Sequence, residues 1–365
     1  MTNNDTSTGE SSSGKNKLGL KTLILIALCT QKFAFTVLRR YSVGILKENY
    51  SKYEVLLASE VIKIFFSAGM VYQKFGIGTP DNKFSGKNKV WYLTKSSGKM
   101  ILLAFIYGAM NILAYISLQN IGAGMYTIIA QCKLLSTAVF SVVLLKRSFS
   151  WARWRSFIVL VLGVMLFSEP MWKSQTNNNE SQLSAESSPR NSKAMLVGMS
   201  AVWFEVALCG FASVYFEKVI KTGPMELDIW ELNFQLGLGS VPIYMFFLIT
   251  ERGGSVGFLH GWSIWAVLLS LLGACGGMLV ALSLKHADSI LKTIATTGAI
   301  MLIALFDHYF LGGPLTLSMM MSCIQVVIAI CNYTFDSSQS NSEMPKQSSI
   351  KCQSNERPEK SLQNL

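Results

Sequence analysis

The residues best placed to do chemistry are charged side chains inside long apolar stretches of this sequence. Lys133 stands near the middle of the apolar run 122–145, about eleven residues from either end. An ammonium group at the centre of a bilayer costs about 2.5 to 3.5 kcal/mol, and such groups usually face a cavity or a partner. Lys133 therefore belongs either to a structural ion pair or to an aqueous path that carries an anionic solute.

A second charged position lies in the run 55–75. Glu60 and Lys63 are three residues apart, so they fall on one face of a helix. One interpretation is a purely structural ion pair. The other is a lysine that its glutamate holds ready for a phosphate group, which avoids an unpaired charge while the site is empty.

A third cation, Lys292, opens the run 290–311 and is followed directly by Thr293. A lysine near a helix end often extends its ammonium group to the membrane surface. The alternative is that Lys292 lies opposite Lys133 and serves the same anion.

Uncharged polar residues inside the apolar runs complete the candidate site. Asn111 and Asn233 are amides in otherwise apolar sequence, and Tyr126 lies two helical turns before Lys133 on nearly the same face. Each alone is explained by a hydrogen bond between membrane helices. Together they supply the donors, acceptors and aromatic surface that a nucleobase and sugar hydroxyls require.

The composition is that of a membrane protein. Hydrophobic residues make up 50% of the 365 residues and charged residues 15%, against about 25% charged in soluble domains. The net charge of +11 comes from lysines and arginines in short loops between apolar runs. Membrane orientation explains that pattern, so nucleic acid is not an expected partner. The seven cysteines show no metal-binding spacing, and no enzyme motif occurs, so we expect no catalytic residue, metal or cofactor.

The elements that position these residues are predicted to be membrane-spanning helices, which need about 20 apolar residues each. Ten runs qualify: 18–38, 55–75, 100–118, 122–145, 154–170, 194–216, 230–249, 262–284, 290–311 and 315–335. The fold class predicted is an all-α membrane protein with ten transmembrane helices. Lysine and arginine accumulate on one side of the predicted membrane, which places both termini in the cytosol.

Polar segments divide the chain. Residues 1–17 and 336–365 are expected to be disordered cytosolic tails, and 171–193 a polar lumenal loop with a glycosylation sequon at Asn179. Between them, 18–170 and 194–335 each hold five spans.

The two halves show an internal similarity at an offset of 166 residues. It matches Leu113 with Leu279 and Ser117 with Ser283, and it brings Thr127 onto Thr293. An odd number of spans per repeat places the second copy upside down, an arrangement that many secondary transporters use for alternating access.

Several motifs resemble a known family. "NIGAGMYTIIAQCKLLSTAVFSVVLLKRSFSWARW" (120–154), "GFASVYFEKVIK" (210–221) and "LKHADSILKTIATT" (284–297) are similar to the fourth, sixth and eighth-to-ninth spans of nucleotide-sugar transporters in the drug/metabolite transporter superfamily. "RRYS" (39–42) and "SEVIKIF" (59–65) fit the first two spans. The resemblance covers about 20–335 and points to the branch that carries CMP-sialic acid, UDP-galactose and UDP-N-acetylglucosamine.

This resemblance implies an inverted-repeat antiporter in the Golgi membrane, although the endoplasmic reticulum stays open. It would import a nucleotide sugar and export the nucleoside monophosphate. These substrates and the lipid bilayer are the expected partners, and formation of a homodimer stays open. In the family, the positions of Lys133 and Lys292 neighbour phosphate, and those of Glu60 and Lys63 help to line the site. Nucleotide-binding positions match the remaining candidates Asn111, Tyr126 and Asn233.

The chain also departs from the family pattern. The fourth span often reads "YQVTYQLK" where this chain has "YTIIAQCK" (126–133), and Gly237 and Gly239 replace a tyrosine and a serine of sialic-acid carriers. These differences favour UDP-galactose or a related UDP-hexose over CMP-sialic acid. A carrier of another anionic metabolite and a polytopic enzyme or scaffold are the other readings.

Overall fold

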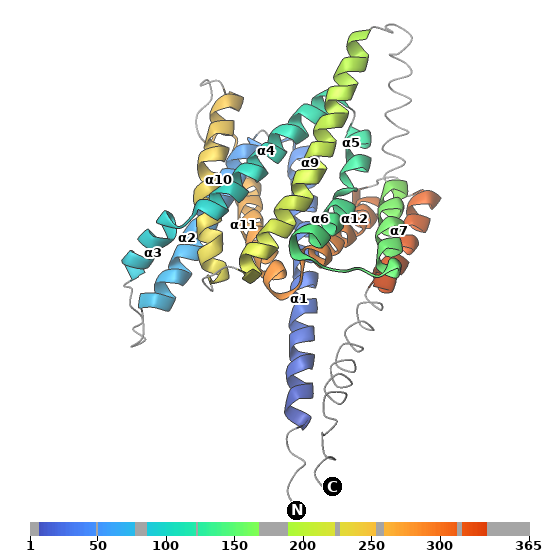
Figure 1. The fold of residues 1–365 in the computed structure, drawn as a ribbon. Helices are drawn as coiled ribbons and strands as arrows, with labels where there is room; N and C mark the ends of the chain where they lie inside the picture. The colour runs from blue at the N-terminus through green and yellow to red at the C-terminus, as the bar shows by residue number, and fades with distance from the viewer. Residues whose placement is uncertain are drawn as a thin grey trace, which may run out of the picture.

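The computed structural model describes residues 7–48, 50–76, 86–121, 123–167, 189–222, 227–252, 259–311 and 316–333, and within these ranges it contains helices but no strand. The elements are α1 (Ser7–Arg40), η1 (Tyr41–Ile45), α2 (Lys52–Gly76), α3 (Gly86–Lys95), α4 (Gly98–Asn120), α5 (Ala123–Ala130), α6 (Lys133–Leu145), α7 (Trp151–Phe167), α9 (Pro189–Thr222), α10 (Ile229–Arg252), α11 (Ile264–His286) and α12 (Ser289–Leu311). A last helix covers Leu317–Tyr333. Figure 1 shows their arrangement as a bundle.

Most of the predicted spans are long apolar helices, and the protein is a multi-pass membrane protein. Within the described ranges, eight segments are long and apolar enough to cross a bilayer: Gly19–Val43, Lys52–Lys74, Gly98–Asn120, Met125–Leu145, Ala194–Thr222, Ile229–Glu251, Ile264–His286 and Ser289–Phe310. The predicted spans 154–170 and 315–335 correspond to α7, which has 17 residues, and to the short last helix. The count of ten therefore stays a prediction.

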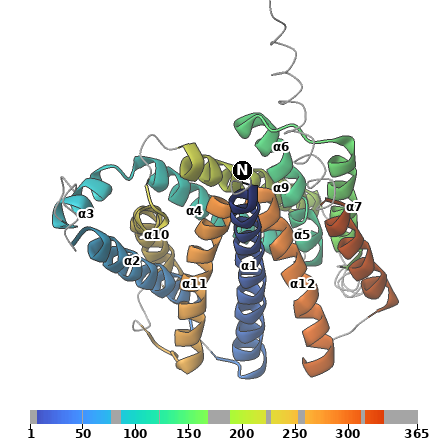
Figure 2. The ribbon, with the colours of Figure 1, turned by 90° about the horizontal axis from the view of Figure 1, so that it is seen from below.

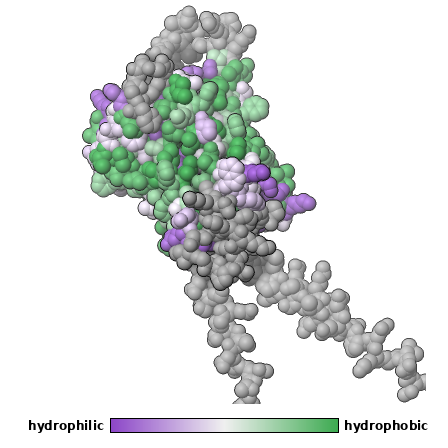
Figure 3. All heavy atoms as spheres, turned by 90° about the vertical axis from the view of Figure 1, so that its left-hand side faces the viewer, coloured by the Kyte–Doolittle hydropathy of each residue, from purple (hydrophilic) through white to green (hydrophobic). Residues whose placement is uncertain are grey.

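The surface of the bundle fits a bilayer. Large apolar side chains such as Phe65, Phe105 and Phe246 are more than 60% exposed, whereas soluble monomers rarely expose large contiguous apolar areas. Figure 3 shows an apolar belt across one side of the molecule, with hydrophilic residues toward its two ends.

Helix boundaries differ from the prediction in three places. α1 begins at Ser7, inside the segment expected to be a tail, because a helix that has formed extends at low cost. α3 was not predicted. The predicted span 122–145 is found as Met125–Leu145, but a turn at Gln131 and Cys132 divides it into α5 and α6.

The division between α5 and α6 has a local cause. The Gln131 side-chain amide donates to Thr127 O at 3.1 Å, which is the carbonyl that the Gln131 backbone would use in a regular helix. The backbone amide of Gln131 instead donates to Ile128 O at 3.2 Å, and Cys132 N to Ile129 O at 3.0 Å. The turn is thereby tightened, and side-chain competition for a backbone acceptor explains it.

Helix ends recur at the offset of the sequence similarity. α4 runs from Gly98 to Asn120 and α11 from Ile264 to His286, 166 residues later at both ends. The same offset relates the start of α5 to the start of α12, and the end of α6 to the end of α12. It also relates both ends of α7 to those of the last helix, Leu317–Tyr333. Even the bonds that end α4 and α11 correspond, because Ile121 N donates to Ser117 O and Ala287 N to Ser283 O, both at 2.8 Å.

Helix contacts follow the same correspondence. α4 packs on α9 as α11 packs on α1, and α6 packs on α9 as α12 packs on α1. α4 contacts α10 as α11 contacts α2. In Figure 1, α1 begins below the bundle whereas α9 begins above it, so the first helices of the two halves run in opposite directions.

Small residues let the central helices approach one another. Figure 2 shows α11, α1 and α12 side by side, and the amide nitrogen of Gln31 on α1 donates to Leu272 O of α11 at 2.7 Å. A methyl group at Gly276 would lie 2.4 Å from that nitrogen. α9 meets α6 at Gly210, where a methyl group would lie 2.7 Å from the carbonyl carbon of Ser136. Close approach of this kind is typical of membrane helix packing.

Candidate functional site

The first group of predicted site residues lies on α2, α4 and α10. Lys63, which is buried, has its Nζ 2.7 Å from each carboxylate oxygen of Glu60. Asn111 of α4 is hydrogen bonded to Tyr244 of α10, and the charge of Glu60 acts on that tyrosine. Gly277 of α11 leaves room for the lysine, because a methyl group there would lie 3.2 Å from Lys63 Cδ. The predicted pair of Glu60 and Lys63 is therefore formed in the interior.

Asn233 belongs beside this group. It lies one turn before Gly237, where a methyl group would contact Ile64 and the Glu60 carbonyl. Asn233 is fully buried, and neither its amide nitrogen nor its amide oxygen has a hydrogen-bond partner among the described residues. Buried amides are nearly always paired, so an unpaired one is a strong indication of a missing ligand or water.

The second group surrounds Lys133. Tyr126 of α5 donates from its hydroxyl to Oε1 of Glu205 on α9 at 2.8 Å. The other oxygen of Glu205 is buried and makes no hydrogen bond to a described residue. Lys133 interacts electrostatically with Glu205. Because α6 begins at Lys133, the positive end of its helix dipole reinforces the ammonium group.

Lys292 joins this second group from α12. Its Nζ lies 3.0 Å from Ser213 Oγ of α9, and its charge interacts with those of Lys133 and Lys32. The neighbouring Thr293 uses its hydroxyl within its own helix, donating to Ser289 O at 2.8 Å. Lys133 and Lys292, which the sequence placed on separate spans, are thus brought into one electrostatic cluster.

Two residues of the second group were missed by sequence reasoning. Lys32 lies in the middle of the span Gly19–Val43, and Glu205 lies inside Ala194–Thr222. The argument that singled out Lys133, an ionisable side chain within an apolar helix, would have identified both. Asn179, the predicted glycosylation position, lies outside the described residues.

α9 connects the two groups. Cys209 of α9 lies close to Tyr107 of α4, to Tyr126 of α5 and to Lys292 of α12. Tyr107 in turn lies close to Glu60 and Tyr244 of the first group, so this helix borders both groups. A ligand with a polar ring at one end and anionic groups further along would meet both sets.

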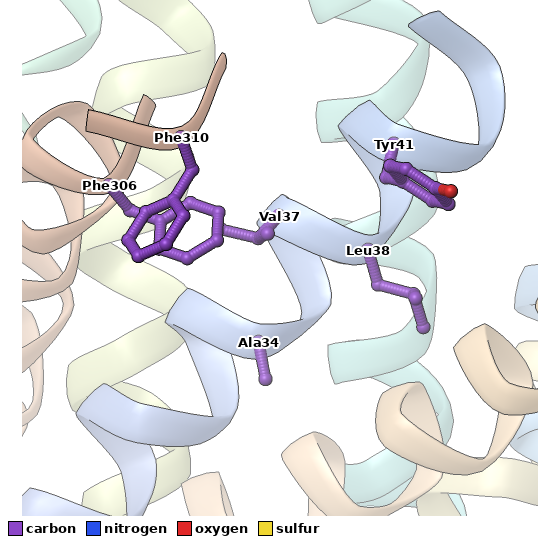
Figure 4. Close-up of a pocket in the computed structure, with 6 residues that line it drawn as sticks. All are labelled: Ala34, Val37, Leu38, Tyr41, Phe306 and Phe310. Carbon is purple, nitrogen blue, oxygen red and sulfur yellow. The ribbon is translucent and has the colours of Figure 1, made fainter. Parts of the chain in front are cut away.

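Two cavities lie near these helices, and their linings differ in chemistry. One of about 250 Å³ is bounded by α1, α2, α4 and α11, and it includes Asn111 together with the polar side chains Arg39, Lys52 and Tyr53. The other lies between α1 and α12, and Figure 4 shows its apolar lining, formed by Ala34, Val37, Leu38, Tyr41, Phe306 and Phe310. Only the first is suited to a polar ligand.

Buried carboxylates tie together each end of the bundle. Glu217 of α9 accepts hydrogen bonds from Arg147 at 2.6 Å and Lys221 at 2.7 Å, and from Ser289 N at the start of α12. At the start of α11, Glu54 of α2 accepts from Trp262 Nε1 at 2.8 Å. The two networks lie at opposite ends of α11, whose 23 residues span about 34 Å.

A third carboxylate lies at the same end as Glu217. Burial alone would raise the pKa of the Asp228 carboxyl. Hydrogen bonds from Lys74, from the backbone of Ile229 and from Lys285, together with the charge of Lys74, outweigh burial and lower this pKa below its usual value. Asp228 therefore links the end of α2, the start of α10 and the end of α11 as an ionised group.

Comparison with known proteins places this arrangement in context. The chain is 31% identical to the human UDP-N-acetylglucosamine transporter over 335 residues, covering 87% of this chain and 96% of that protein. It is 28% identical to UDP-galactose translocator 1 of Caenorhabditis elegans, covering 88% and 90%, and 29% identical to the UDP-galactose transporter of Schizosaccharomyces pombe, covering 86% and 88%. A solved crystal structure shares the fold with a TM-score of 0.58 at 11% identity, covering 86% of this chain and 97% of that one.

A model of one protein family covers nearly all the helices described above. It is the model for nucleotide-sugar transporters, and it matches residues 16–334, which include both groups of site residues and both end networks. The lysines and amides of the candidate site thus lie within the matched region. This chain belongs to the nucleotide-sugar transporter family.

Proposed function

We propose that this protein exchanges a UDP-sugar, UDP-galactose or a related UDP-hexose, for UMP across the Golgi membrane by alternating access. The observation that carries the proposal is the cluster of Lys133 and Lys292 beside α9, together with the buried, unpaired amide of Asn233 in the other group of site residues. One phosphate group would interact with the two lysines, and the uracil or ribose would satisfy the amide. The family is one of transporters rather than enzymes, and its curated members named above carry UDP-sugars.

The helix correspondence supports alternating access. Contacts between α4 and α9 are matched by those between α11 and α1, and the first helices of the halves run in opposite directions. We infer two inverted five-helix repeats with cytosolic termini. The Glu217 and Glu54 networks lie at opposite ends of the bundle, where gates that open alternately would have to lie.

The proposed exchange can be tested in proteoliposomes. Vesicles that contain the purified protein would be preloaded with UMP, CMP or GMP, and uptake of radiolabelled UDP-galactose, UDP-N-acetylglucosamine, GDP-mannose and CMP-sialic acid would be measured. We expect uptake of a UDP-sugar to be stimulated by UMP inside the vesicle. No stimulation by any nucleotide, with protein shown to be folded, would exclude nucleotide antiport.

A substitution of Lys133 tests the site itself. Lys133→Met removes the charge and keeps the length of the side chain, and we expect exchange to fall at least about tenfold, because a charge-assisted contact contributes about 1.5 to 3 kcal/mol. Lys99→Met, at an exposed lysine near the start of α4, is the matched control and should retain exchange. If the two variants behave alike, Lys133 does not bind the transported anion.

A further inference from the structure

Lys32 is the intramembrane cation that the sequence reading overlooked. It lies near the middle of the span Gly19–Val43 and is half-buried. Its neighbour Gln31 bonds to α11, and its other neighbour Phe33 packs edge-on against Phe306 of α12 at 5.4 Å. α1 is therefore held between α11 and α12 at the level of Lys32.

Helix packing places Lys32 with the other two lysines. Cys29, one turn before Lys32 on the same face, lies opposite Gly298 of α12, 4.0 Å from where a methyl group would stand. α12 in turn packs on α6. The charge of Lys32 interacts with those of Lys133 and Lys292, so α1, α6 and α12 each contribute one cation to a single cluster.

Carboxylates of the described residues interact with two of the three lysines in this cluster, but none bonds to the third. Glu205 interacts with Lys133, and Glu217 interacts with Lys292. No carboxylate of the described residues forms a hydrogen bond or ion pair with Lys32. Like charges in a medium of low dielectric repel one another strongly. An anion that contacts all three lysines would relieve the repulsion.

The number of cations indicates the class of anion. A nucleoside monophosphate presents one phosphate group, whereas a nucleoside diphosphate sugar presents two in sequence. On the proposed function, Lys133 and Lys292 are the ligands of the first phosphate. We propose that Lys32 binds the second phosphate, so that α1 makes the site selective for nucleoside diphosphate sugars over nucleotides with a single phosphate.

Competition assays on the full-length protein test this assignment. UMP, UDP and UDP-galactose would be compared as inhibitors of UDP-sugar uptake by proteoliposomes that contain wild type, Lys32→Met or Lys32→Arg. For Lys32→Met we expect the half-inhibitory concentrations of UDP and UDP-galactose to rise about tenfold and that of UMP less than about threefold. Lys32→Arg, which keeps the charge, should recover most of the difference.

The matched control is Lys21→Met on the same helix. It removes the same charge eleven residues away, or about 16 Å along the helix, and should leave the ratio of UDP to UMP inhibition unchanged. Equal shifts for UMP and UDP in Lys32→Met, or none, would overturn the assignment. So would a preference of the wild type for CMP-sialic acid that Lys32→Met abolishes, because the second anionic group would then be a carboxylate.

Thermal unfolding in detergent gives a second readout that does not depend on transport. Removing one of three mutually repelling charges should leave the midpoint of ligand-free Lys32→Met equal to or above that of the wild type, while stabilisation by UDP shrinks toward that by UMP. A lower midpoint with undiminished stabilisation by UDP would show a structural role and overturn the proposal. If the wild type responds to no nucleotide, the proposed function itself fails, which is a different result.

Discussion

At the scale of single residues, the cost of a charge in the membrane is the guide to function. Lys133 and Lys32 both lie near the middle of apolar membrane spans, and neither forms a hydrogen bond or ion pair through its ammonium group with any residue in the described ranges. Lys63 differs, because Glu60 neutralises it at 2.7 Å. The first two are therefore suited to a transported anion, and the third to holding the site together when it is empty.

Substitutions of Tyr126 can distinguish the role of its hydroxyl group from that of its aromatic ring. Its hydroxyl holds Glu205 at 2.8 Å, and none of the described aromatic rings stacks on its ring. Stacking of a base on an aromatic ring contributes about 1 to 3 kcal/mol, so we expect Tyr126→Ala to weaken UMP binding about tenfold or more. Tyr126→Phe, which keeps the ring, should weaken it less than about threefold.

Calorimetry or scintillation proximity binding of UMP to the purified variants would measure these changes. Equal losses in both variants would mean that the hydroxyl and its bond to Glu205 matter, and not the ring.

At the scale of elements, α9 is the helix on which the proposed site depends. It carries Glu205, Cys209 and Ser213, and it reaches α6 only because Gly210 has no side chain. α5 and α6 meet at the tightened turn formed by Gln131, which directs the start of α6, and with it Lys133, toward this helix.

A methyl group at Gly210 should separate α9 from α6. It would lie 2.2 Å from Ser136 Oγ and 2.8 Å from the backbone nitrogen of Thr137, so backbone must move. We expect Gly210→Ala to cost about 1 to 3 kcal/mol of stability and to reduce nucleotide binding. Gly69→Ala on α2, where a methyl group meets nothing within 4 Å, is the matched control. Thermal unfolding with and without UMP measures both effects, and similar midpoints for the two variants would contradict this account of the contact.

At the scale of the whole molecule, the offset between the two halves relates residues of the proposed site to one another. The offset of 166 residues that relates α4 to α11 also brings Tyr126 onto Lys292. One half therefore presents an aromatic hydroxyl where the other presents a cation. An internal two-fold axis would place these two side chains on either side of the midplane, as the ends of one elongated ligand require.

Orientation in the membrane can be tested through Asn179. The proposed topology places the loop 171–193 in the lumen, so the sequon should be glycosylated in cells that modify lumenal loops. We expect treatment with an endoglycosidase to increase the electrophoretic mobility of the wild type but not of Asn179→Gln. A cytosolic location of this loop, shown by protease protection in intact microsomes, would contradict the topology.

The apolar runs by themselves determined the helical class, the approximate position of every long apolar helix and the offset between the halves, because about 20 consecutive apolar residues have few alternatives to a membrane helix. They also singled out Lys133, Glu60 and Asn233, because polar groups in such runs are costly. The pairing of Glu60 with Lys63 followed from their spacing on one helix, and it is formed in the structure.

Only the tertiary structure decided which of these polar groups meet. The partners of Tyr126 and Lys292 are Glu205 and Ser213 on α9, each 79 residues distant in sequence. Helical periodicity predicts which residues share one face of a helix, but it does not predict which other helix packs against that face. The division of α5 from α6 was also decided by a side-chain bond that apolar patterning does not record. The cationic cluster exists because packing brings α1, α6 and α12 together, and it is the feature on which the proposed selectivity for two phosphates depends.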